Sequence, residues 1–230
     1  MVAKKAMTGI TEPLRGGSML DRSKPYGEII GPHRAAYDQD GKFFDIHGNE
    51  IRVGETSKTL LFHGKRLEPY ISGKGLDIGA GRDSVSEDVQ VFDKEDGDAG
   101  RIDVEGPFDY VWSSHCLEHL ENPRKALGLW WNLVADGGYL IIIVPDEDLY
   151  EQGVWPSRYS QDHKHTFTVE KVVSWSPVSI NLRSLLLELG GTLELLEVQD
   201  DGYDYTLEDV DQTGMPDPRL AQIMAVIHRG

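Results

Sequence analysis

The residue types best suited to chemistry gather between residues 75 and 93, around two glycines and two aspartates. The run GLDIGAGRDS begins with a short apolar stretch and contains Asp77, Gly79 and Gly81. Asp93 ends the next apolar stretch. Glycines let the backbone approach a ligand that a Cβ atom would exclude, and a carboxylate at the end of a second strand can accept both hydroxyls of an adenosine ribose. These residues therefore predict an adenosine ligand.

Other motifs that would announce a different ligand are incomplete or absent. The dinucleotide motif G-x-G-x-x-G needs a third glycine where this chain has Ser84. Neither the phosphate loop G-x-x-x-x-G-K-[ST] nor the nucleophile elbow G-x-S-x-G occurs. The run DKEDGDAGRIDVE has the acidic character of a calcium loop, but Asp98 and Val104 stand where its invariant glycine and bidentate glutamate belong. The pattern favours adenosine without a pyrophosphate.

Histidines provide the candidates for acid–base chemistry. His163 and His165 lie in SRYSQDHKHTFT, which follows the most hydrophobic run and should therefore lie above the carboxyl edge of a parallel sheet. Either could act as a general base, and the alternative is a hydrogen-bonded histidine in a lid. No cysteine and no third spaced ligand accompanies them, so the sequence predicts no metal site. In HCLEHL, His119 is interpreted as a packed or capping residue and Glu118 as a structural partner.

Alternating strands and helices must position these residues, which indicates an α/β fold. The runs that predict parallel strands are GLDIGA, VQVFD (89–93), FDYVWSS (108–114) and YLIIIVP (139–145). One helix should begin after Asn122, with Pro123 in its first turn, and end at Gly137-Gly138. INLRSLLLELGG (180–191) predicts another. TLELLEVQ (192–199) and AQIMAVIHR (221–229) have no helical pattern between them, so they should pair antiparallel.

The 230 residues, 39% of them hydrophobic, suffice for one core without a dividing linker. Residues 1–56 predict an N-terminal arm, because the stretch 7–32 is rich in Gly, Pro and Ser, with a small hairpin within 42–54. The α/β domain is expected over 57–230, with Ser57 as the cap of its first helix. A lid and substrate-binding region is expected at about 146–180.

Charge and cysteine content limit the partners. The formal net charge is -16, and such a surface repels nucleic acid and anionic lipid. The longest apolar stretch, at 139–145, is too short to span a bilayer. Cys116 is the single cysteine, which fits a reducing cytoplasm. These features predict neither nucleic acid nor membrane as the partner and leave a small molecule, and the oligomeric state stays open.

Four successive runs resemble the ordered motifs of class I S-adenosylmethionine-dependent methyltransferases. They are LDIGAG, FD at 92–93, FDYVWSSHCLEHLENPRKAL and LVADGGYLIIIVPDEDLYE, covering roughly residues 75–148. The S-S-H-x-L-E-H and G-G-x-L-x-x-x-V-P patterns are most similar to the type-eleven branch. The resemblance implies a Rossmann-like methyltransferase fold, with a doubly wound, mostly parallel seven-stranded sheet and an antiparallel C-terminal strand.

The resemblance also implies which residues bind S-adenosylmethionine. The residues implied at the methionine end and the ribose are Asp77, Gly79, Ala80, Gly81 and Asp93. Those implied beside the adenine are Lys94, Asp98 and Ala99. Those implied beneath the sulfonium are Ser113, Ser114, His115 and Leu117. The family's third turn glycine is replaced by Asp83, and the segment between Asp93 and Asp98 is too short for the usual helix.

The expected activity is methyl transfer to a small polar acceptor, with a sugar or sugar-linked metabolite as one candidate class. Because the sulfonium already activates the methyl group, alignment of the acceptor is the main task and a base is needed only for a protonated nucleophile. Two alternatives stay open. The first is a non-catalytic binding module, which is consistent with Asp83 in place of glycine and with the short segment between Asp93 and Asp98. A nicotinamide-dependent oxidoreductase is disfavoured by Ser84 and by the C-terminal strand pair.

Overall fold

The computed structural model describes residues 54–215 and 218–230, together with the backbone of five short strands that precede them. β1 (Thr11–Pro13) pairs antiparallel with β2 (Met19–Asp21). β3 (Ala36–Tyr37), β4 (Phe43–Phe44) and β5 (Glu50–Ile51) form an antiparallel sheet, in which β4 and β5 fall within the segment expected to form a hairpin. The rest of the arm expected over 1–56 lies outside the described residues, except for residues 54–56.

A six-stranded sheet forms the centre of the described part, with the order β12-β13-β9-β8-β6-β7. Its strands are β6 (Gly75–Ile78), β7 (Gln90–Phe92), β8 (Phe108–Ser114), β9 (Val134–Pro145), β12 (Thr192–Gln199) and β13 (Gln222–His228). The strands β7, β6, β8 and β9 are parallel, whereas β13 runs antiparallel to both β9 and β12. This order fits the Rossmann-like fold that the sequence resemblance implies, with the expected antiparallel C-terminal strand.

The expectation of seven strands is wrong for this sheet, because the short connection between β7 and β8 contains no strand. It holds only a 3₁₀ turn, η1 (Ala99–Arg101), with irregular chain on either side. β7 is therefore the sheet's edge strand. The consequence for the site is that the side of the cavity next to η1 is formed by a loop instead of a further strand and helix.

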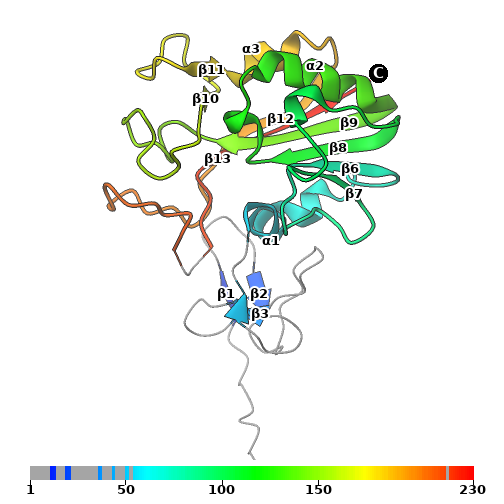
Figure 1. Ribbon diagram of the computed structural model, residues 1–230. Helices are drawn as coiled ribbons and strands as arrows, with labels where there is room; N and C mark the ends of the chain where they lie inside the picture. The colour runs from blue at the N-terminus through cyan, green and yellow to red at the C-terminus, as the bar shows by residue number, and fades with distance from the viewer. Residues whose placement is uncertain are drawn as a thin grey trace, which may run out of the picture.

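Helices cover both faces of the sheet, as Figure 1 shows, with α2 (Pro123–Leu133) and α3 (Leu182–Leu187) on one side and α1 (Glu55–Leu67) on the other. Alternate residues of β9 follow this division. Leu140 and Ile142 belong to the apolar cluster that includes α2 and α3, whereas Ile141 belongs to the cluster that includes Leu60 of α1. Because both faces are buried there, β9 is apolar from Tyr139 to Pro145. Within the described ranges, no helix is long and apolar enough to cross a membrane.

The capping prediction for α2 is confirmed, but its predicted end is wrong. The Asn122 side chain accepts from the Lys125 amide, and Pro123 occupies the first turn. The helix ends at Leu133, and Gly137-Gly138 lie inside β9. A Cβ on Gly138 would stand 2.7 Å from the Asp109 carbonyl oxygen, so Gly138 permits close approach of the neighbouring strand instead of ending the helix.

The segment after β9 is fastened over the carboxyl edge of the sheet by a buried carboxylate. Glu147 accepts hydrogen bonds from Thr166 Oγ1 at 3.0 Å and Ser179 Oγ at 2.5 Å, one residue in each strand of the parallel pair β10 (Thr166–Thr168) and β11 (Ser179–Asn181). It also pairs with Lys171 Nζ at 3.0 Å. This segment lies within the range 146–180 that the sequence assigns to a lid.

Candidate active site

A cavity of about 500 Å³ opens at the carboxyl ends of β6, β7 and β8. Its lining consists of the glycine turn after β6, the end of β7 with the loop to η1, and the turn after β8. The lining residues are Gly79, Gly81, Phe92, Asp93, Lys94, Gly97, Asp98, Ala99, His115, Cys116, His119 and Leu120. Of the residues predicted to bind the cofactor, Gly79, Gly81, Asp93, Lys94, Asp98, Ala99 and His115 lie here. Sequence reasoning missed Phe92, Gly97, Cys116, His119 and Leu120.

Both turn glycines adopt left-handed backbone conformations, with φ of 81° at Gly79 and 58° at Gly81. A Cβ on Gly79 would lie 2.7 Å from Cys116 Sγ, so a side chain here would collide with the turn after β8. A Cβ on Gly81 would lie 3.9 Å from Asp93 Oδ2. The chain thus leaves a bare backbone opposite a carboxylate, which is a cradle that side chains would fill.

Asp93 is held at the mouth of this cradle by its own loop. Its Oδ1 accepts from the Lys94 amide at 2.6 Å, and its amide donates to Asp96 Oδ2 at 2.9 Å. Nearby, Asp98 Oδ1 accepts from the Gly100 amide and caps η1. The loop that replaces the missing strand is therefore organised by its own aspartates, and Asp98 has one oxygen committed to that role.

Asp77 does not line the cavity, because its side chain is fully buried behind the glycine turn. Its Oδ2 accepts from the Val85 amide at 2.8 Å, which ties the far end of the turn to β6. Burial raises the pKa of Asp77 to about 8, and the carboxylates of Asp83 and Asp93 contribute to this rise. Asp77 is thus protonated near neutral pH and shapes the turn from beneath.

Asp83, which stands in place of the family's third turn glycine, caps the first helix. Its Oδ2 accepts from the Ser57 amide at 2.9 Å, and its Oδ1 accepts from the Ser57 hydroxyl. The helix begins at Glu55, with no side-chain cap from Gly54. The prediction that Ser57 itself is the cap is wrong, because Ser57 lies inside the first turn and donates to a carboxylate from the glycine turn instead.

The turn after β8 forms the floor of the cavity, and the end of β8 supports that turn from within the protein. Ser113 Oγ donates to the Ile78 carbonyl at 3.0 Å, and Ser114 and Leu117 are buried beneath the surface. These three residues, like Ala80, do not line the cavity. Burial raises the pKa of the Cys116 thiol to about 12, with the carboxylate of Glu118 as a further cause, so the thiol stays protonated at the cavity wall.

His115 connects this floor to the antiparallel strand. It has a positive φ of 51°, and its Nε2 lies 3.0 Å from Gln222 Oε1. Gln222 in turn donates to Thr59 Oγ1 at 2.8 Å and to Gln199 Oε1 at 2.7 Å. The strained backbone of His115 is thus supported by a hydrogen-bond network that includes α1, β12 and β13.

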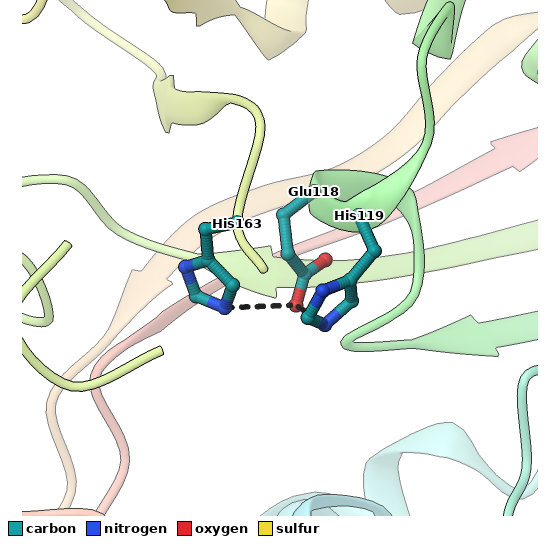
Figure 2. A group of neighbouring side chains, drawn as sticks. All are labelled: Glu118, His119 and His163. Atoms are coloured by element: carbon teal, nitrogen blue, oxygen red, sulfur yellow. Dashed lines mark ion pairs between the residues drawn. The ribbon is translucent and has the colours of Figure 1, made fainter. Parts of the chain in front are cut away.

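A second group of polar side chains borders the cavity where the 3₁₀ turn η2 (Leu117–His119) meets the segment after β9. Figure 2 shows Glu118 and His119 of η2 facing His163. The amides of Lys164 and His165 donate to the Glu118 carbonyl at 2.8 and 3.2 Å, which holds that segment against η2. The structure therefore brings predicted His163 to the site together with two residues interpreted from sequence as structural.

The predicted pair His163 and His165 divides between two environments. The side chain of His163 is only 4% exposed, and its Nδ1 lies 2.8 Å from Glu151 Oε1. His165 is partly exposed and contacts η2 through its backbone amide. The nearby Tyr150 ring lies 5.3 Å from the His163 ring, and burial raises the pKa of its phenol. His163 is thus held in place by neighbours on two sides.

Comparison with known proteins identifies one family. Residues 42–190, more than half of the chain, match the model of a family described as a methyltransferase domain. No curated protein matches the chain significantly.

Solved structures of methyltransferases are similar at low identity. One is an S-adenosylmethionine-dependent methyltransferase from Thermotoga maritima, with 17% identity and a TM-score of 0.47, covering 69% of this chain and 83% of that one. Another is from Clostridium acetobutylicum, with 10% identity, a TM-score of 0.48 and coverage of 76% and 90%. The N-methyltransferase NodS from Bradyrhizobium japonicum has 15% identity and a TM-score of 0.44, covering 73% of this chain and 93% of that one. The family assignment rests on the family match.

Proposed function

The chain belongs to the methyltransferase-domain family, as a class I S-adenosylmethionine-dependent methyltransferase, and we propose that it methylates a small polar acceptor held where the cavity meets η2. The observation that carries this proposal is the cradle formed by Gly79, Gly81 and Asp93 at the carboxyl ends of β6 and β7. In an open α/β sheet, ligands bind at this edge. The assignment to the type-eleven branch stays a prediction.

The residues of the cradle suit the parts of the cofactor in a definite order. Asp93 would accept the two ribose hydroxyls, because its Oδ2 lies opposite the bare backbone of Gly81. Lys94, Asp98 and Ala99 would border the adenine, in the loop that precedes and forms η1. The methionine end would pass over Gly79 toward His115 and Cys116. Asp77 would act through the shape of the turn.

When bound, S-adenosylmethionine supplies a methyl group already activated by its sulfonium. The protein's share is then to orient the acceptor and keep water out. For a hydroxyl acceptor, His163 and His165 are the proposed bases, and Glu151 would fix the His163 ring by its 2.8 Å contact with Nδ1. The carboxylates of Glu118, Glu151 and Asp162 lie in or beside η2 and favour acceptors that donate hydrogen bonds through hydroxyl or amino groups. A sugar or sugar-linked metabolite is our candidate for such an acceptor. The single cysteine favours a cytoplasmic enzyme.

Thermal shift separates this proposal from its alternatives. A ligand that binds only the native state must raise the melting temperature, by an amount set by its concentration relative to Kd. We expect stabilisation by S-adenosylmethionine and S-adenosylhomocysteine and none by NADH. Stabilisation by NADH alone would favour an oxidoreductase. Absence of any shift with the methyl donor and its product would leave a non-catalytic binding module as the better account.

A further inference from the structure

Glu118, His119 and His163 present three ligand atoms to one another at the edge of the cavity. Glu118 Oε1 lies 3.7 Å from His119 Nε2 and 4.0 Å from His163 Nε2, and the three ligand atoms all lie within 4.8 Å of one another. Figure 2 shows both rings directing a nitrogen at the same carboxylate oxygen. The two contacts are too long for hydrogen bonds. They suit ligands of a shared ion, since two atoms each about 2.1 Å from a metal lie at most about 4.2 Å apart.

Glu118 is an independent sign of a missing cation. Its side chain is fully buried, and neither carboxylate oxygen has a hydrogen-bond partner among the described residues. A buried carboxylate without partners is strongly destabilising, because its charge has lost the solvation of water. The nearest compensating groups are three imidazoles, since His115 Nδ1 also lies 3.7 Å away. A divalent cation between these groups would remove the cost.

Both candidate histidine ligands are oriented by an oxygen acceptor on the opposite ring nitrogen. His163 Nδ1 lies 2.8 Å from Glu151 Oε1. His119 Nδ1 lies 3.3 Å from the Asp162 carbonyl oxygen, its hydrogen-bond partner, and the Asp162 carboxylate is 3.2 Å away. When Nδ1–H donates to a carboxylate or a backbone carbonyl, the lone pair of Nε2 is free and faces Glu118. Such outer partners orient histidine ligands in metal sites, and their presence on both histidines distinguishes the cluster from an incidental group of polar side chains.

From this geometry we propose that Glu118, His119 and His163 bind a divalent transition-metal ion, such as Zn²⁺ or Mn²⁺, with open coordination positions toward the cavity. Two imidazoles and one carboxylate suit ions of this class. His119 lines the cavity, so the ion would stand beside the bound cofactor. Metal binding does not depend on the proposed function. The ion's use, which is to hold an acceptor oxygen or nitrogen for methylation, does rest on it.

Metal binding would give His163, one of the two predicted catalytic residues, a different role. A nitrogen that ligates a metal cannot accept a proton, so His163 would be a ligand, and His165 would stay the candidate base. This metal site could not be predicted from sequence spacing, because its ligands come from two separate segments of the chain. Glu118 and His119 sit in η2, whereas His163 is brought to them by the amides that bind the Glu118 carbonyl.

Calorimetry on the untagged full chain, stripped with a chelator, tests metal binding with Zn²⁺ alone. We expect saturation at one ion per chain. Glu151→Gln should weaken the affinity by about 10–100-fold, as expected for a residue that orients a ligand, and Glu118→Gln should weaken it further. His228→Gln, which alters a histidine at the end of β13, is the matched control and should bind as the native chain does.

A second readout keeps the test decisive if a variant unfolds. Co²⁺ bound by nitrogen and oxygen ligands absorbs visible light, and His119→Gln, at a side chain 30% exposed, should abolish this absorption while leaving the circular dichroism native. No Zn²⁺ binding to the native chain, or equal affinity in the Glu118→Gln variant, would overturn the inference. Titration of the stripped chain with S-adenosylmethionine distinguishes this failure from failure of the proposed function.

Discussion

At the scale of single residues, burial gives Asp77, behind the glycine turn, and Asp93, in the cradle, different roles. Asp77 is fully buried and accepts from the Val85 amide, whereas Asp93 lies at the cavity with its Oδ2 facing Gly81. The pKa of Asp77, raised to about 8 by burial, keeps its carboxyl protonated through most of the physiological range. Asp77 therefore acts as a neutral hydrogen-bonding residue that supports the turn.

Asp77→Asn tests this protonation state. Between about pH 4 and pH 8 the unfolded carboxyl ionises while the folded one keeps its proton, so this group lowers the stability of the native chain as pH rises. Asparagine does not titrate and can still accept from the Val85 amide. The melting temperature of the variant minus that of the native chain should therefore increase from pH 5 to pH 8, by several degrees at roughly 2–4 °C per kcal/mol. A difference independent of pH would contradict the raised pKa.

The position of the cradle residues in the fold can be predicted from the sequence, whereas the contacts made by Glu118 and His119 in η2 cannot. A glycine turn followed by an acidic strand end is a local pattern, so the order of residues alone places Gly79, Gly81 and Asp93 at one edge of the sheet, where the cavity lies. The chemistry of Glu118 depends on burial and on His163, a contact set by the fold of the segment after β9. Spacing within HCLEHL alone cannot reveal such a contact.

At the scale of elements, Asp83 links the glycine turn to the start of α1. The carboxylate accepts from both the amide and the hydroxyl of Ser57, at the helix end where amides lack partners and a negative charge is favourable. A Cβ on Gly54 would lie 2.3 Å from Asp83 Oδ2, so glycine is required where the chain enters the helix. The departure from the family glycine thus has a structural explanation.

Replacing the Asp83 carboxylate should lower the free energy of unfolding by the amount that a helix cap contributes. We expect Asp83→Ala to cost about 1 kcal/mol and to lower the melting temperature by roughly 2–4 °C. Asp83→Asn, which can still accept a hydrogen bond, should lose less. The exposed Asp88→Ala is the matched control. An Asp83→Ala variant that melts with the control would show that the contact contributes nothing to stability.

Strong local signals predict the elements, and contacts made elsewhere decide their ends. Asn122-Pro123 marks the start of α2 correctly, because capping depends on adjacent residues. The predicted helix over 180–191 is the shorter α3, since residues 179–181 pair with β10 as β11. That pairing depends on the buried Glu147, whose partners in both strands a local pattern does not reveal.

At the scale of the whole molecule, the strand order brings the cradle and the group of Glu118, His119 and His163 to the same edge of the sheet. β6 and β7 end at the glycine turn and Asp93, β8 ends before η2, and β9 leads to the segment that carries His163. The antiparallel pairing of β12 and β13 is predictable because no helix separates them. The absence of a strand between β7 and β8 is harder to predict. The sequence shows that the connection is short, but it does not show that β7 therefore becomes the edge strand of the sheet.

The central claim is that Asp93 holds the ribose of S-adenosylmethionine, and titration calorimetry of the native chain against two variants tests it most directly. Asp93→Ala should abolish measurable binding, since the ribose hydroxyls would lose the carboxylate that accepts them. Asp103→Ala, which removes an exposed carboxylate on the same connection, should bind with native affinity. Unchanged affinity in Asp93→Ala would contradict the account.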